Sequence, residues 1–212
     1  MRGLRFALVV LVPLLAGPQA SDAVAADTPA APAADPCLTN KCRPADAAII
    51  FVDVDGQKKS AQAGKLPYTN VEKAAVTVTL GEMLTFTADS DGKVLSNVAL
   101  AGAAKATDAD PAPLAATVKT GSGQIVLKFT QTKNPATNSR LVVTHNFEGT
   151  LVFDAYILPF SAGADKESAT CPVAQGNRAS TTWYVPVLVA TLAGLRLVEK
   201  AEPVTASEIV CQ

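Results

Sequence analysis

The stretch "GQIVLKFTQTK", residues 123–133, alternates between apolar and polar side chains with a period of two. Ile125, Leu127 and Phe129 fall on one face of an extended chain, and lysine and threonine side chains fall on the other. This pattern is typical of a β-strand that buries one face and exposes the other. The stretch therefore predicts a half-buried strand in a β-sheet protein.

Similar runs recur along the chain and are separated by short turns. They occupy residues 47–54, 74–80, 82–88, 94–100, 140–146 and 150–158. Turn residues that tolerate positive φ lie at Asp55-Gly56, at Asp91-Gly92 and within residues 120–123. Many short strands without long helical segments between them predict one antiparallel β-sandwich, Greek-key or immunoglobulin-like, over residues 46–212.

The segment at residues 185–198 carries two competing patterns. Leu188, Leu192 and Leu195 have helical spacing, whereas valines at 185, 187 and 189 alternate as in a strand. We favour a strand, with one short C-terminal helix as the alternative. Pro186 and Arg196 leave too short an apolar run for a membrane span.

The N-terminal residues read as a secretory signal peptide over residues 1–25. A basic start is followed by the apolar run "FALVVLVPLLAG" at 6–17 and by an A-x-A site ending at Ala25. Residues 26–45 are Pro- and Ala-rich and predict a linker that contains the Cys37/Cys42 loop. We expect export to the periplasm or the cell exterior, in a bacterium because no N-x-[ST] acceptor is present, with no stable membrane insertion after cleavage.

The four cysteines of the chain all lie beyond the predicted signal peptide. In an oxidising compartment an even number of cysteines predicts disulfides. We favour Cys37 with Cys42 and Cys171 with Cys211; the two crossed pairings remain open. A tetrahedral metal site needs two closely spaced ligand pairs, and only the first cysteine pair has such spacing, so we expect no metal.

Candidate catalytic residues are few. The only histidine, His145, alternates with apolar neighbours and is predicted to be a hydrogen-bonded core residue. Glu82, Glu148 and Asp154 are carboxylates that a hydrolytic site could use, although each is expected to be a solvated charge. The sequence has no nucleophile elbow, phosphate loop or dinucleotide fingerprint, so no cofactor is expected.

Two short acidic runs, "DVDG" at 53–56 and "DSDG" at 89–92, resemble fragments of calcium loops. Both lack the first ligand and the bidentate glutamate of the full loop, so hairpin turns are the preferred interpretation. Trp183 and Tyr184 form an adjacent aromatic pair. If exposed, they would form a binding surface; the alternative is a core anchor near Cys171.

The net charge of −1, without clustered lysine and arginine, predicts no nucleic-acid partner. We expect an exported, non-catalytic binding or structural protein with a protein or carbohydrate partner. One alternative is a hydrolase acting on polysaccharide or envelope material, which two carboxylates about 5–10 Å apart in a cleft would favour. Another is a subunit of a cell-surface assembly, which a long exposed edge strand or an unfilled groove would favour.

Overall fold

The structure is a computed structural model. It describes residues 37, 41–70, 74–115, 117–133, 135–161, 165–201 and 209–211, without the side chains of residues 209 and 210. The predicted signal peptide, residues 1–25, and most of the predicted linker, residues 26–45, lie outside the described residues and stay predictions. Within the described part of the chain, no helix has the length and apolar character needed to cross a membrane.

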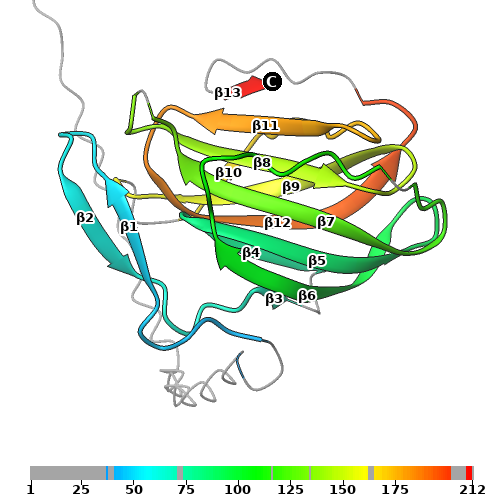
Figure 1. The fold of residues 1–212 in the computed structure, drawn as a ribbon, viewed down its shortest axis with the longest axis horizontal. Coiled ribbons are helices and arrows are strands. Elements are labelled where there is room, and N and C mark those ends of the chain that lie inside the picture. Colours follow the sequence, from blue (N-terminus) through cyan, green and yellow to red (C-terminus); the bar gives the residue numbers. More distant parts are fainter. Residues whose placement is uncertain are drawn as a thin grey trace, which may run out of the picture. The chain divides into compact units, whose positions relative to one another are not determined.

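Two antiparallel sheets stack face to face around one core (Figure 1). The five-stranded sheet has the order β10 (Lys166–Ser168), β9 (Thr150–Pro159), β12 (Val187–Val198), β4 (Ala75–Thr79), β3 (Thr69–Asn70). The six-stranded sheet has the order β13 (Ile209–Cys211), β11 (Arg178–Trp183), β8 (Ser139–His145), β7 (Gly121–Gln131), β5 (Glu82–Ser90), β6 (Leu95–Lys105). The predicted all-β antiparallel sandwich is confirmed.

A separate ribbon of β1 (Ala48–Val52) and β2 (Lys58–Gln62) lies at one end of the sandwich (Figure 1). The side-chain amide of Gln131 accepts from Val52 N and donates to Val52 O, both at 2.7 Å, as a neighbouring strand would. Apolar side chains of β1, including Phe51, are buried against the core. The ribbon is therefore docked on the sandwich through its inner face.

The predicted alternation of inward and outward side chains is present in β7. Ile125, Leu127 and Phe129 are fully buried between the sheets. Lys128 points to the opposite, outer face, as predicted, but is buried there as well, which the sequence did not predict. The cause is the loop of residues 106–115, which crosses β7 and β8 on their outer side (Figure 1).

Charged groups hold this 106–115 loop in place. The Asp110 carboxylate lies 3.0 Å from Lys128 Nζ and 2.9 Å from Arg140 Nη1. Farther along the loop, Leu114 N donates to Thr144 Oγ1 at 3.4 Å. The chain's own loop therefore covers the outer face of the six-stranded sheet over part of β7 and β8, whereas the outward residues of β6 stay exposed.

The strand interpretation of residues 185–198 is confirmed and the helix alternative is wrong. β12 pairs with β9 with irregularities between Val187 and Val189 and between Ala193 and Arg196. Gly194, at φ +61°, lies in the second irregularity. Each inserted residue shifts the phase of the alternation, so side chains three positions apart, such as Leu192 and Leu195, both point inward. The four-residue step from Leu188 to Leu192 fits plain alternation, and the three-residue step from Leu192 to Leu195 reflects the bulge at Gly194.

Both acidic runs form hairpin turns, as preferred. Asp53 Oδ1 accepts from Asp55 N at 3.0 Å and Gln57 N at 2.9 Å, which closes the turn between β1 and β2. Asp91 Oδ1 accepts from the amides of residues 93 and 94, each at 2.8 Å, which closes the turn between β5 and β6. Such carboxylate-to-amide bonds are the usual role of aspartate in turns.

Both favoured disulfides are confirmed: Cys37 pairs with Cys42, and Cys171 with Cys211. Directly after Cys42, the guanidinium of Arg43 is buried and forms a bidentate pair with Glu82, Nε to Oε1 at 2.7 Å. Arg43 also donates to the carbonyl oxygens of Leu66, Pro67 and Thr77 and lies over the ring of Tyr68. The two disulfides indicate an oxidising, exported environment.

Candidate functional site

Trp183 is not part of an exposed aromatic surface. It is 3% exposed, its ring contacts Phe129 edge to face at 5.9 Å, and its Nε1 donates to Ser168 Oγ at 2.7 Å. Tyr184, which directly follows β11, is 52% exposed. The prediction that Trp183 and Tyr184 together form a binding surface is therefore wrong for Trp183. This residue is a core anchor near Cys171, which was the alternative interpretation.

His145 is a buried core residue, as predicted. Its Nε2 donates to Val173 O at 2.9 Å, and its Nδ1 accepts from Phe147 N at 3.1 Å. Both ring nitrogens are thus used by the main chain, which assigns the neutral tautomer with the proton on Nε2. Burial lowers the pKa of His145, and the hydrogen bond to Val173 only partly opposes this effect.

This pKa predicts that acid weakens the fold before the carboxylates titrate. Below about pH 6.5 the unfolded chain binds a proton at residue 145 that the folded chain does not bind, so stability falls. We expect the free energy of unfolding, measured by urea denaturation between about pH 7 and pH 5, to decrease by at most about 1.4 kcal/mol per pH unit. It stays constant at higher pH, where both states are neutral at this residue.

The His145→Gln variant should lose this pH dependence, since His145 is the only histidine of the chain. If the variant does not fold, the imidazole signals of the wild-type chain can be followed by NMR. An imidazole in the folded chain that titrates at or above pH 6.5 would contradict the prediction.

The three candidate carboxylates are not brought together. Glu82 is paired with Arg43, Asp154 is paired with Arg196, and Glu148 lines a different cavity from either. Instead, Asp154 shares a groove with Glu167, which was missed. Glu167 lies opposite Tyr156 in the register of β10 and β9, so it is the diagonal neighbour of Asp154 on the same face, at a Cα separation of about 7–8 Å.

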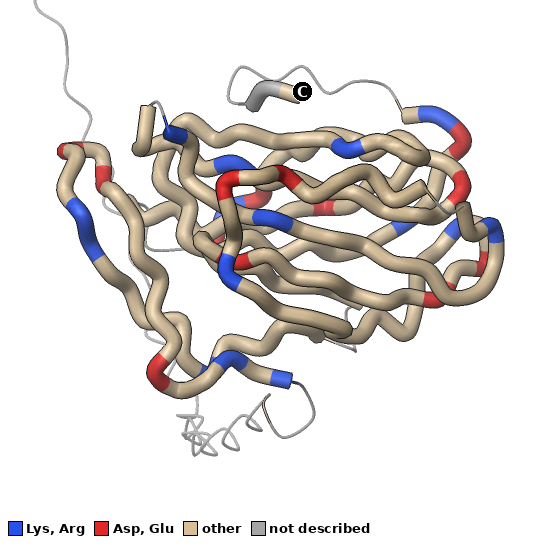
Figure 2. Tube along the Cα trace, in the orientation of Figure 1, with Lys and Arg blue, Asp and Glu red and all other residues tan. Residues whose placement is uncertain are grey.

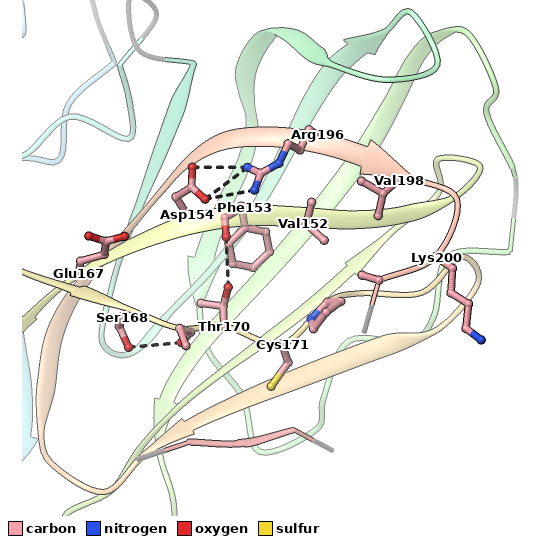
Figure 3. A pocket seen from close by; sticks show the side chains of 13 residues that line it. Val152, Phe153, Asp154, Glu167, Ser168, Thr170, Cys171, Arg196, Val198 and Lys200 are labelled. Carbon is pink, nitrogen blue, oxygen red and sulfur yellow. Dashed lines mark hydrogen bonds and ion pairs between the residues drawn. The ribbon is translucent and has the colours of Figure 1, made fainter. Parts of the chain in front are cut away.

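The groove forms where the chain leaves the edge of the five-stranded sheet. β10 pairs with β9 as far as Ser168, and pairing resumes at Val173, which exchanges two hydrogen bonds with Leu151. Between them, residues 169–172 leave the ladder, and Cys171 is bonded to Cys211 in β13 of the opposite sheet. The opening has a volume of about 730 Å³, and we call it the Arg196 groove (Figure 3). Its polar lining residues are Asp154, Glu167, Ser168, Thr170, Arg196 and Lys200.

An exposed ion pair lies along this groove. Arg196 Nη1 and Nη2 each lie 3.3 Å from Asp154 Oδ1, and Nη1 also donates to Gly194 O at 2.9 Å (Figure 3). The side chains of Arg196 and Asp154 are 46% and 50% exposed. The bulge at Gly194 accommodates the pair: a Cβ there would lie 2.8 Å from Asp154 Oδ2.

Tyr156 extends the polar face beyond the groove. It lies two residues after Asp154 on β9, opposite Glu167, and is 43% exposed. Val152 and Val198 are half-buried and form an apolar part of the groove lining, between the charged groups. The outer face of this sheet thus presents an aromatic ring, opposite charges and apolar patches to water.

A second cavity of about 680 Å³ also has Arg196 and Val198 in its lining. It carries Lys93, Lys119 and Glu148, so its charges are mixed as well. Basic and acidic residues are interspersed along the described chain (Figure 2). Arg196 therefore stands where two mixed-charge hollows meet.

The hydroxyl groups of the Arg196 groove already have partners within the fold. Ser168 Oγ accepts from Trp183, and Thr170 Oγ1 donates to Phe153 O at 3.3 Å. His145 is buried and bonded elsewhere, so neither hydroxyl has the adjacent base that activates a nucleophile. The described residues contain no group of three or more His, Cys, Asp or Glu side chains placed to hold a metal ion.

No family model matches the chain, and it matches neither a curated protein nor a solved structure.

Proposed function

We propose that the chain is an exported, non-catalytic binding protein that recognises its ligand on the outer face of the five-stranded sheet, at the Arg196 groove. The observation that carries the proposal is the composition of this face, on which Asp154, Tyr156 and Arg196 are exposed around a hollow. On the other sheet, the 106–115 loop covers the middle of the outer face through the pairing of Lys128 with Asp110. The part of that face left exposed on β6 carries mainly small side chains.

The paired disulfides support an exported location, which we take to be the periplasm or the exterior of a bacterial cell. One of them also lies at the groove, because Cys171 is among the lining residues and is bonded to Cys211 of the opposite sheet. Mixed charges on this face favour a polar ligand over nucleic acid, which requires a basic surface.

The surface-assembly alternative gains little support from the edge of the six-stranded sheet. β6 is a long edge strand, but its pairing with β5 shifts register twice, and Asn97 within it has φ +49°. Bulges and a charged residue such as Lys105 are devices that prevent another strand from pairing with an edge. At the Arg196 groove, β10 and Val173 already occupy the edge of β9.

The hydrolase alternative gains one observation, because two carboxylates, Asp154 and Glu167, line the same groove. A general acid, however, is usually kept protonated by apolar surroundings. Asp154 is half exposed and faces a guanidinium. We therefore keep binding as the proposal, and release of reducing sugar from polysaccharide, abolished by Asp154→Asn, would replace it with hydrolysis.

The test compares two exposed ion pairs on opposite sheets. The full chain is incubated with the insoluble envelope fraction of the exporting cell, and co-sedimentation is measured. We expect the Asp154→Asn/Arg196→Gln variant to bind at least about tenfold more weakly than wild type, because hydrogen bonds to charged groups contribute about 1.5–3 kcal/mol each. The matched control is Asp108→Asn/Lys133→Gln, which removes a more exposed pair, 85% and 82% exposed, from the side of the six-stranded sheet.

Both variants should fold with nearly wild-type stability, since exposed ion pairs contribute little. Absence of binding by wild type, or equal losses in the two variants, would contradict the proposal.

A further inference from the structure

We infer that the ligand of the Arg196 groove is a neutral oligosaccharide; this inference rests on the proposed function. The exposed ring of Tyr156 lies on the same face as Asp154 and Glu167. A pyranose ring has an apolar C–H face and a rim of hydroxyl groups. An exposed tyrosine ring flanked by carboxylates matches both, since the ring packs against the C–H face and the carboxylates reach the hydroxyls.

Asp154 and Arg196 also offer hydrogen-bonding groups to a ligand. A carboxylate has about four acceptor sites and a guanidinium has five donors. The pairing of Asp154 with Arg196 uses some of them, and both side chains remain about half exposed to water. Donors and acceptors held side by side suit neighbouring hydroxyls, each of which both donates and accepts.

The charges of the side chains that line the groove are balanced. The groove carries two acidic side chains, Asp154 and Glu167, and two basic ones, Arg196 and Lys200. Figure 3 shows Arg196 directed toward Asp154, and Lys200 directed away from them. Because opposite charges balance within the groove, neither a polyanion nor a polycation is favoured, and a neutral polar chain is.

A protein ligand fits less well. The cores of protein interfaces are depleted in charged residues, whereas the groove is lined by four. An extended peptide that added a strand to β9 would find only the short stretch between Leu151 and Ala155 open, because β10 and Val173 occupy the edge on either side.

The face is also long enough for several sugar units. From Val152 to Tyr156 the strand β9 extends over about 13 Å. The second cavity continues the hollow past Arg196 toward Lys93 and Lys119. An oligosaccharide rather than a single sugar is therefore the ligand whose length matches the site.

The experiment titrates the ¹⁵N-labelled full chain with neutral oligosaccharides of glucose, xylose and N-acetylglucosamine, and with an oligogalacturonate as the anionic comparison. We expect one neutral series to shift amide signals at residues 152–156, 166–168 and 196–198. Tyr156→Ala and Asp154→Asn should each weaken binding by about tenfold or more. Tyr184→Ala, which removes another exposed tyrosine that does not line the groove, should leave the affinity unchanged.

The outcomes separate the two proposals. If no neutral series shifts these signals while the envelope fraction is still bound through Asp154 and Arg196, the saccharide inference is overturned and the proposed binding function stands. A preference for the galacturonate, or binding that is lost in Tyr184→Ala and kept in Tyr156→Ala, would also overturn the inference. If neither the envelope fraction nor any saccharide is bound, both proposals fail.

Discussion

Replacing Arg43 with methionine should lower the free energy of unfolding by about 3–5 kcal/mol, because it leaves the Glu82 carboxylate without its partner in a largely buried setting. Arg43 also satisfies carbonyl oxygens of Leu66, Pro67 and Thr77. Pro67 O and Thr77 O would lose this donor at the same time, whereas Leu66 O keeps the backbone amide of residue 43. Urea denaturation at neutral pH measures the change.

Two further variants test whether the destabilisation comes from the buried Arg43–Glu82 pair. Arg196→Met removes an arginine from an exposed pair and should cost less than about 1 kcal/mol. Adding Glu82→Gln to Arg43→Met should restore part of the loss, because the unpaired charge is then gone. Equal losses in Arg43→Met and Arg196→Met would show that the buried pair does not join the segment after Cys42 to the sandwich.

Removing the Cys171–Cys211 disulfide should have the second large effect. The bond joins residues 40 positions apart, and on the chain-entropy model its loss costs about 4 kcal/mol. The Cys37–Cys42 bond spans only five positions, and its loss should cost about 2 kcal/mol at most. We expect the double alanine variants, compared by thermal and urea denaturation, to show this order.

The Cys171→Ala/Cys211→Ala variant also tests how the groove is built. Without the bond, residues 169–172 are free to pair with β9 between Ser168 and Val173, which would close the Arg196 groove. Ligand binding should therefore fall in this variant and persist in Cys37→Ala/Cys42→Ala. A larger destabilisation in the Cys37/Cys42 variant, or unchanged binding in both, would contradict this account.

The long alternating strands could be predicted from the sequence because each carries its own pattern. β7 and β9 bury one face, and their inward residues follow the period of two. β2 and β10 were not predicted, because "KKSAQ" has no apolar alternation and β10 has only three residues. Such short polar strands form because a neighbouring strand offers free backbone groups, and that is a property of the fold.

The candidate site was only partly predictable for the same reason. Asp154 was recognised as a strand-borne carboxylate, but Arg196 was noted only as an interruption of an apolar run. The two meet because β12 pairs with β9 and because the bulge at Gly194 changes the phase of β12. Glu167 joins them through the register of a three-residue strand. Long-range pairing and bulges leave no local signal in the sequence.

The central claim, that the outer face of the five-stranded sheet is the binding face, is tested most directly by hydrogen–deuterium exchange of the full chain, free and bound to the envelope fraction. We predict that binding protects the amides of residues 152–156, 166–173 and 194–198. The edge strand β6 and the turn at Tyr184 and Val185 should exchange as in the free chain. Protection confined to β6 or to that turn, with none along β9 and β12, would contradict the account.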